Sequence, residues 1–151
     1  MNKNKTVLEG LGLAIQLEKS MVDYYKHAAE KDHHGAITEQ FRALADRHFV
    51  FVSRLDSQRE RLHAENGEGV IGHAIEAIGK AIFDTLAGLP VSAIRAETDL
   101  TIPSFIRGEE GLRAAYSHIA TDADPETAAL AQAAIENCDE NIARLNGMLV
   151  R

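Results

Sequence analysis

Three side chains that could bind a metal ion stand at positions where a helix would bury them. Glu18 and Glu109 each continue a series of apolar residues spaced three and four apart, and His48 does the same in another segment. A buried carboxylate is costly unless it is paired, hydrogen-bonded or bound to a metal. Carboxylate and imidazole groups together suit iron, manganese or zinc. The pattern therefore predicts either one such ion at Glu18, His48 and Glu109 or a hydrogen-bonded cluster without metal.

Four further residues are expected beside these three. Tyr25 and Tyr116 each follow one of the two glutamates by seven residues, and Cys138 and Asn141 occupy the inner positions of the last segment. Each tyrosine could donate a hydrogen bond to a glutamate across the bundle, which would satisfy the buried carboxylates without metal. We expect Cys138 to be a small buried side chain rather than a nucleophile, because no basic group lies near it in the sequence.

The elements that must position these residues are predicted to be helices. Apolar spacing indicates five of them, at about residues 7–31, 34–65, 70–87, 102–120 and 125–149. Short turns at 33–35 and 121–124 make antiparallel pairs, and residues 67–100 form a longer link between the pairs. The sequence therefore predicts one all-α domain over residues 1–151. It is an up-down four-helix bundle made of two helical hairpins, joined by a crossover that carries a short extra helix.

The glutamate followed by a tyrosine seven residues later resembles the pattern of rubrerythrin-type proteins in the ferritin-like superfamily. That resemblance implies this motif on the first and third bundle helices, and Glu-x-x-His on the second and fourth, around a di-iron site. Here His48 and Phe51 stand where the second helix of the family has Glu and His, and Cys138 and Asn141 replace them on the last helix. The resemblance therefore implies the fold together with a degenerate di-metal site.

A second resemblance covers residues 5–149. The run Arg107-Gly108-Glu109-Glu110, the following Tyr116 and the glycine-bounded segment 69–88 resemble an uncharacterised bacterial four-helix-bundle family within the same superfamily. That family has no settled biochemical role, so the resemblance implies a bacterial source and a fold but no activity.

The missing ligands decide the predicted function. A di-iron centre needs about six protein ligands, mostly carboxylates, and this chain offers three at the matching positions. We therefore predict a non-catalytic protein with a structural or stress-associated role and no catalytic residue. The alternative is a metal-binding protein with a single iron, manganese or zinc ion at Glu18, His48 and Glu109. No small-molecule substrate is indicated.

Composition limits the partners and the compartment. The chain of 151 residues has a net charge of −7, which argues against nucleic acid and anionic membranes as partners. A single cysteine favours a reducing compartment, and neither a signal peptide nor an apolar run of membrane-spanning length is apparent, so we expect a cytoplasmic protein. Leftover apolar surface on segment 70–87 predicts a homodimer.

Overall fold

The computed structural model describes residues 3–31, 35–66 and 98–149. These residues form four helices and no strand: α1 (Lys3–Lys31), α2 (Gly35–Asn66), α5 (Thr98–Asp122) and α6 (Pro125–Leu149). The predicted all-α bundle is confirmed at this level. The predicted helix at 70–87, on which the homodimer prediction depended, lies outside the described residues.

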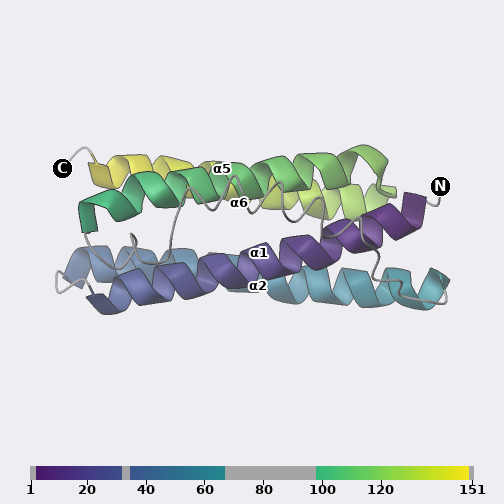
Figure 1. Cartoon of the computed structure of the whole chain (residues 1–151), viewed down its shortest axis with the longest axis horizontal. Helices are drawn as coiled ribbons and strands as arrows, with labels where there is room; N and C mark the ends of the chain where they lie inside the picture. The colour runs from purple at the N-terminus through teal and green to yellow at the C-terminus, as the bar shows by residue number, and fades with distance from the viewer. Residues whose placement is uncertain (1–2, 32–34, 67–97, 150–151) are drawn as a thin grey trace.

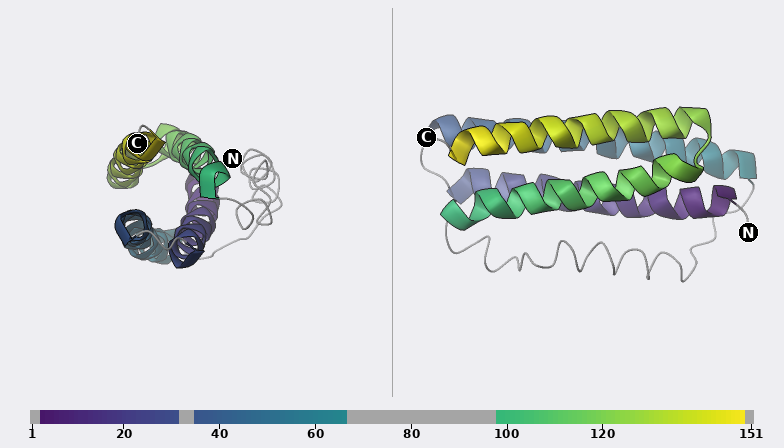
Figure 2. Two further views of the ribbon diagram at one scale, coloured as in Figure 1. Left: turned by 90° about the vertical axis from the view of Figure 1, so that its left-hand side faces the viewer. Right: turned by 90° about the horizontal axis from the view of Figure 1, so that it is seen from above.

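The four helices form two antiparallel hairpins, α1 with α2 and α5 with α6 (Figure 1). The end-on view in Figure 2 shows the hairpins side by side around a common core, so that α1 lies beside α5 and α2 lies beside α6. α2 ends and α5 begins at opposite ends of the bundle (Figure 1). Every helix therefore presents one inner stripe to the same core, which is the arrangement that brings the candidate site residues together.

The start of α6 follows from its sequence. The carboxylate of Asp124 accepts a hydrogen bond from the backbone N–H of Thr127 at 3.3 Å, and Pro125 is the first helical residue, where its missing N–H does no harm. Glu126 adds a negative charge in the first turn, near the positive end of the helix dipole. The predicted boundary at 125 is confirmed.

The start of α5 differs from the prediction. The helix begins at Thr98 rather than at 102, so Pro103 lies inside it. A proline removes one backbone hydrogen bond, here to the carbonyl four residues earlier. That carbonyl belongs to residue 99, so the loss falls close to the helix start, where it can be tolerated.

A layer of aromatic rings lies in the core next to the candidate site. The ring of Tyr25 stacks on that of Phe105 at 4.3 Å between centroids and lies 6.1 Å from that of Phe41. All three side chains are buried, and burying each large apolar side chain contributes about 1.5–3 kcal/mol. The same Tyr25 ring lies 5.6 Å from that of His48. The layer therefore packs against one face of the His48 imidazole and orients the hydroxyl of Tyr25.

Among the described residues, no helix combines the length and the apolar character that a bilayer crossing needs.

Two glycines inside α1 allow a matched test of the α1–α5 contact. A Cβ on Gly12 would lie 3.6 Å from the flexible Arg59 guanidinium, whereas a Cβ on Gly10 would lie 3.0 Å from Cγ1 of Ile119. We expect Gly12→Ala to raise the unfolding free energy by about 0.5–1 kcal/mol through helix propensity. Gly10→Ala should raise the unfolding free energy by less, or lower it, because the Ile119 side chain must move. Urea unfolding of the two variants checks this, and equal stabilisation by both would contradict the close contact.

Candidate functional site

The structure brings the three predicted ligands together in the middle of the bundle. Glu18 comes from α1, His48 from α2 and Glu109 from α5, and none of the three has any exposed surface. Nδ1 of His48 lies 2.7 Å from Oε2 of Glu18, and Nε2 lies 2.7 Å from Oε2 of Glu109. The imidazole therefore links the two carboxylates in a row, with one on each ring nitrogen.

The two tyrosines close this row at both ends. The hydroxyl of Tyr25 donates to Oε2 of Glu109 at 2.7 Å, and the hydroxyl of Tyr116 donates to Oε1 of Glu18 at 2.7 Å. Each tyrosine thus serves the glutamate of the other hairpin, so the two bonds cross between α1 and α5. Both residues lie beside the glutamates, as their spacing predicts.

Helix α6 contributes an amide and a thiol. Nδ2 of Asn141 donates to Oε1 of Glu109 at 3.4 Å and lies 3.3 Å from Nε2 of His48. Burial raises the pKa of the Cys138 thiol, and the neighbouring charges of Glu109 and Glu18 raise it further. Cys138 therefore stays a protonated thiol, in line with its predicted lack of nucleophilic character.

Sequence reasoning missed Arg47. Its Nε donates to Oδ1 of Asn141 at 2.8 Å, and its guanidinium also pairs with Glu140. Because this bond occupies the amide oxygen, the NH₂ group of Asn141 is the part that faces the cluster. A signal was present in the sequence: a buried asparagine needs a donor for its oxygen, and Arg47 lies next to His48 on the facing helix. Its charge made it resemble a residue of the solvated face.

The electrostatics of the cluster favour bound protons. Burial alone would lower the pKa of His48, but the charges of Glu109 and Glu18 and their hydrogen bonds outweigh it and raise the pKa to about 10. Burial raises the pKa of Glu18 against the opposing effect of His48. Burial and the adjacent carboxylates also raise the pKa of Tyr25 and of Tyr116. At neutral pH His48 is therefore an imidazolium that donates to both glutamates, and both tyrosines keep their protons.

The geometry of the three ligands suits protons better than a metal ion. The two ring nitrogens of an imidazole point in opposite directions, so the two carboxylates lie at opposite edges of the ring. One ion could then contact only one nitrogen and the carboxylate on that side. Among the described residues, no group of three or more His, Cys, Asp or Glu side chains is arranged to hold a metal ion. An ion at Glu18, His48 and Glu109 stays a prediction that requires His48 to turn.

Comparison with protein-family models, with curated proteins and with solved structures found no match. Membership of the ferritin-like superfamily therefore stays a prediction.

The raised pKa values predict how stability depends on pH. The folded pKa of His48 is about 10 against about 6.5 when unfolded, so its contribution is fully present below pH 6.5 and is lost as pH rises through 10. The raised pKa of Glu18 acts in the same direction above pH 4.5. Over the pH range in which the folded state binds one proton more than the unfolded state, the unfolding free energy should fall by up to about 1.4 kcal/mol per pH unit.

Urea unfolding between pH 6 and pH 10 measures this slope, and an NMR titration of the His48 ring in the folded protein is the control, which should show the ring still protonated at pH 9. Equal stability of the wild type at pH 6.5 and pH 9 would show that His48 carries no extra proton in the folded protein.

Proposed function

We propose that this protein is a non-catalytic, ferritin-like bundle whose central cluster is a degenerate metal site held together by protons. The observation that carries the proposal is the double engagement of His48, whose two nitrogens each meet a carboxylate at 2.7 Å. Each carboxylate is also bound by a tyrosine. The buried polar side chains found without a partner do not include any member of this cluster. A site complete in itself has no need of a ligand to offset its burial.

The charge of the cluster supports the same proposal. Two buried carboxylates need a cation, and in the resembled di-iron proteins iron supplies it. In this chain the imidazolium of His48 occupies that place between Glu18 and Glu109. Phe51, which stands where the family has a ligand histidine, is buried in the core. The positive charge thus comes from a side chain, and the task of the cluster is to hold the helices in one alignment. This fits a structural or stress-associated role rather than catalysis.

A single-ion protein is the second candidate, because the three side chains with metal-binding chemistry do meet. Imidazole and carboxylates bind a metal in their deprotonated forms, so an ion would replace the proton on one side of His48. Iron, manganese or zinc would suit the ligand set. This candidate requires His48 to leave one glutamate, and the tyrosine that serves that glutamate would then have to hold it alone.

Metal analysis of the purified protein separates the two candidates. After expression in medium supplemented with iron, manganese and zinc, and purification without chelators, we expect less than stoichiometric metal and a melting temperature that EDTA does not change. A stoichiometric ion that disappears in Glu18→Ala and in His48→Ala would contradict the proposal and establish the single-ion protein. A bound ion that survives both substitutions would belong to another site and would leave the second candidate wrong.

Two neighbouring residues of α5 allow a test of whether the cluster stabilises the bundle. Glu109 is fully buried in the cluster, whereas Glu110 is exposed. Glu109→Gln removes one charge from a buried ion pair and should lower the unfolding free energy by about 3 kcal/mol. Glu110→Gln, the same change one residue away, should alter it by less than about 0.5 kcal/mol. Similar unfolding curves for the two variants would mean that the cluster does not stabilise the bundle.

A further inference from the structure

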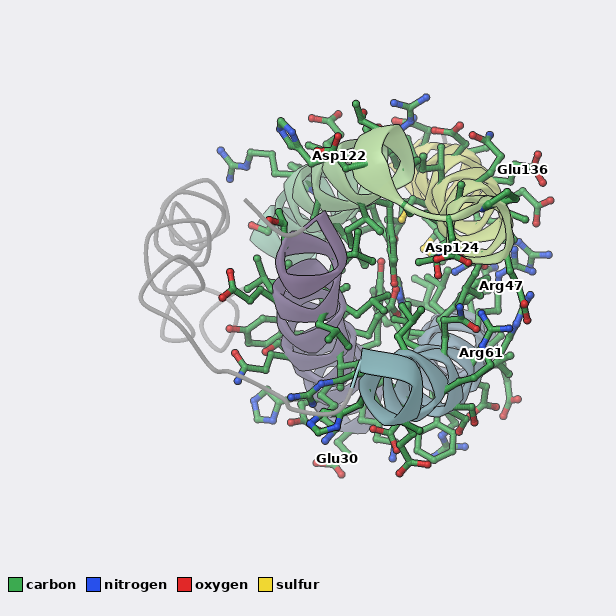
Figure 3. All side chains as sticks on the ribbon, turned by 90° about the vertical axis from the view of Figure 1, so that its right-hand side faces the viewer. Glu30, Arg47, Arg61, Asp122, Asp124 and Glu136 are labelled. Carbon is green, nitrogen blue, oxygen red and sulfur yellow. The ribbon has the colours of Figure 1, made fainter. Side chains whose placement is uncertain are left out.

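The two interfaces between the hairpins differ in chemistry. We call the contact between α2 and α6 the polar seam, defined by Arg47, Gln58 and Arg61 on α2 with Glu126, Thr127, Glu140 and Asn141 on α6 and with Asp124, the residue before α6. Gln58 donates to Thr127 at 2.7 Å, and Arg61 pairs with Glu126 and, at 3.7 Å, with Asp124. Figure 3 shows Arg47, Arg61 and Asp124 together on this side of the bundle. The α1–α5 interface instead has Gly10 close against Ile119, and its polar contacts are the two fully buried tyrosine–glutamate bonds of the cluster.

Two hollows open on the polar seam. One has a volume of about 620 Å³ and is lined by residues of α2 from Ser53 to Arg61 and of α6 from Glu126 to Leu130. The other has a volume of about 410 Å³, and its lining includes Leu44 and Arg144. Arg47 lies between the two linings on α2, and Glu140 lies between them on α6. The Arg47–Glu140 ion pair therefore bridges the seam between the hollows.

A short path leads inward from this bridge. The Arg47 side chain is 28% exposed, and its Nε holds the buried Asn141, whose Nδ2 reaches Glu109 of the cluster. One turn earlier on the same flank of α6 lies Asn137, which is buried and whose Nδ2 has no hydrogen-bond partner among the described residues. Along this path, one ion pair and one amide connect the solvent with the Glu18–His48–Glu109 row.

We propose that the polar seam is the entrance through which small hydrophilic solutes, such as water and hydrated ions, reach the buried cluster, and that the Arg47–Glu140 pair is its gate. Parting the seam releases charged and amide groups that water can hydrogen-bond, and exposed ion pairs contribute little to stability. Parting α1 from α5 would expose apolar side chains and also break the two fully buried tyrosine–glutamate bonds, which costs more than breaking an exposed ion pair. A local opening therefore occurs at the seam before the bundle unfolds. The gate goes beyond the proposed function, since it concerns access whether or not a metal binds.

Cys138 is a built-in probe of this gate. It is the single cysteine of the chain, it is fully buried, and it lies beside Glu109. Alkylation by iodoacetamide, a small neutral reagent, needs the thiolate, which the closed cluster suppresses, so labelling under native conditions reports how often an opening admits both water and the reagent to Cys138. Arg47→Ala removes the gate and the charged hydrogen bond to Asn141, so we expect the labelling rate to rise on the order of tenfold.

The matched control is Arg113→Ala on α5, whose ion pair with Asp139 lies on the other flank of α6. Nε of Arg113 lies 2.8 Å from Oδ1 of Asp139, the residue after Cys138, and both side chains are about half exposed. Arg113→Ala removes a comparable ion pair, between α5 and α6, and leaves the polar seam unchanged. It should therefore keep the labelling rate within about twofold of the wild type. If Arg47→Ala does not fold, Glu140→Gln breaks the same pair from its exposed side and should also accelerate labelling.

Urea unfolding of each variant separates gating from global unfolding. The proposal requires the labelling rate of Arg47→Ala to rise by more than its global unfolding constant does. It is overturned if labelling is unchanged, if Arg113→Ala accelerates it equally, or if the acceleration equals the change in the unfolding constant. Each of these outcomes is independent of whether the purified protein contains metal, so the gate and the metal-free cluster can fail separately.

Discussion

The imidazolium of His48 between two buried carboxylates is the interaction on which the rest of the structure depends. Glu18 and Glu109 have no exposed surface, and two like charges at this depth would be strongly unfavourable without a cation between them. Because the two ring nitrogens diverge, one histidine can donate to one carboxylate on each side. That geometry requires α2 to supply its ring at the level where the glutamates of α1 and α5 face each other. The position of one side chain thus sets the relative level of three helices.

The crossed tyrosine bonds make that alignment specific. Tyr25 of the first hairpin binds the glutamate of the second, and Tyr116 of the second binds the glutamate of the first. A shift of α1 along α5 by one turn, about 5.4 Å, would break both bonds and leave both carboxylates short of a partner. Apolar side chains alone tolerate such shifts, because one buried aliphatic contact resembles the next. The polar cluster therefore supplies the single alignment, while the aromatic layer and the aliphatic side chains around it supply the apolar burial.

Much of this site follows from the sequence because helical spacing determines which residues face the core. Glu18, His48 and Glu109 were predicted to meet on that basis, and they do. Helical spacing does not determine how the His48 ring is oriented. Only the geometry of the ring in the structure distinguishes a bound metal ion from a protonated imidazole between the two carboxylates. Arg47 was missed because it stands on the flank of α2, where spacing makes it a residue of the solvated face. The early start of α5 was missed because Pro103 resembles a helix start, although a proline one turn further in removes only one bond.

The difference between the two hairpins follows from space at the centre of the bundle. His48 and Cys138 occupy matching positions on α2 and α6, and both are fully buried near the row of carboxylates. If both carried large rings, the two side chains would compete for the same volume, and overpacking a core is itself destabilising. One imidazolium already links the two carboxylates, so the matching position needs no second cation and can be small. Asn141, one turn on, then needs only to complete the hydrogen bonds of Glu109, and its own oxygen is satisfied by Arg47 from the surface. Because the histidine lies on α2, α6 contributes only neutral side chains to the cluster. The remaining hydrogen bond of Asn141 is supplied from the solvent side, along the polar seam.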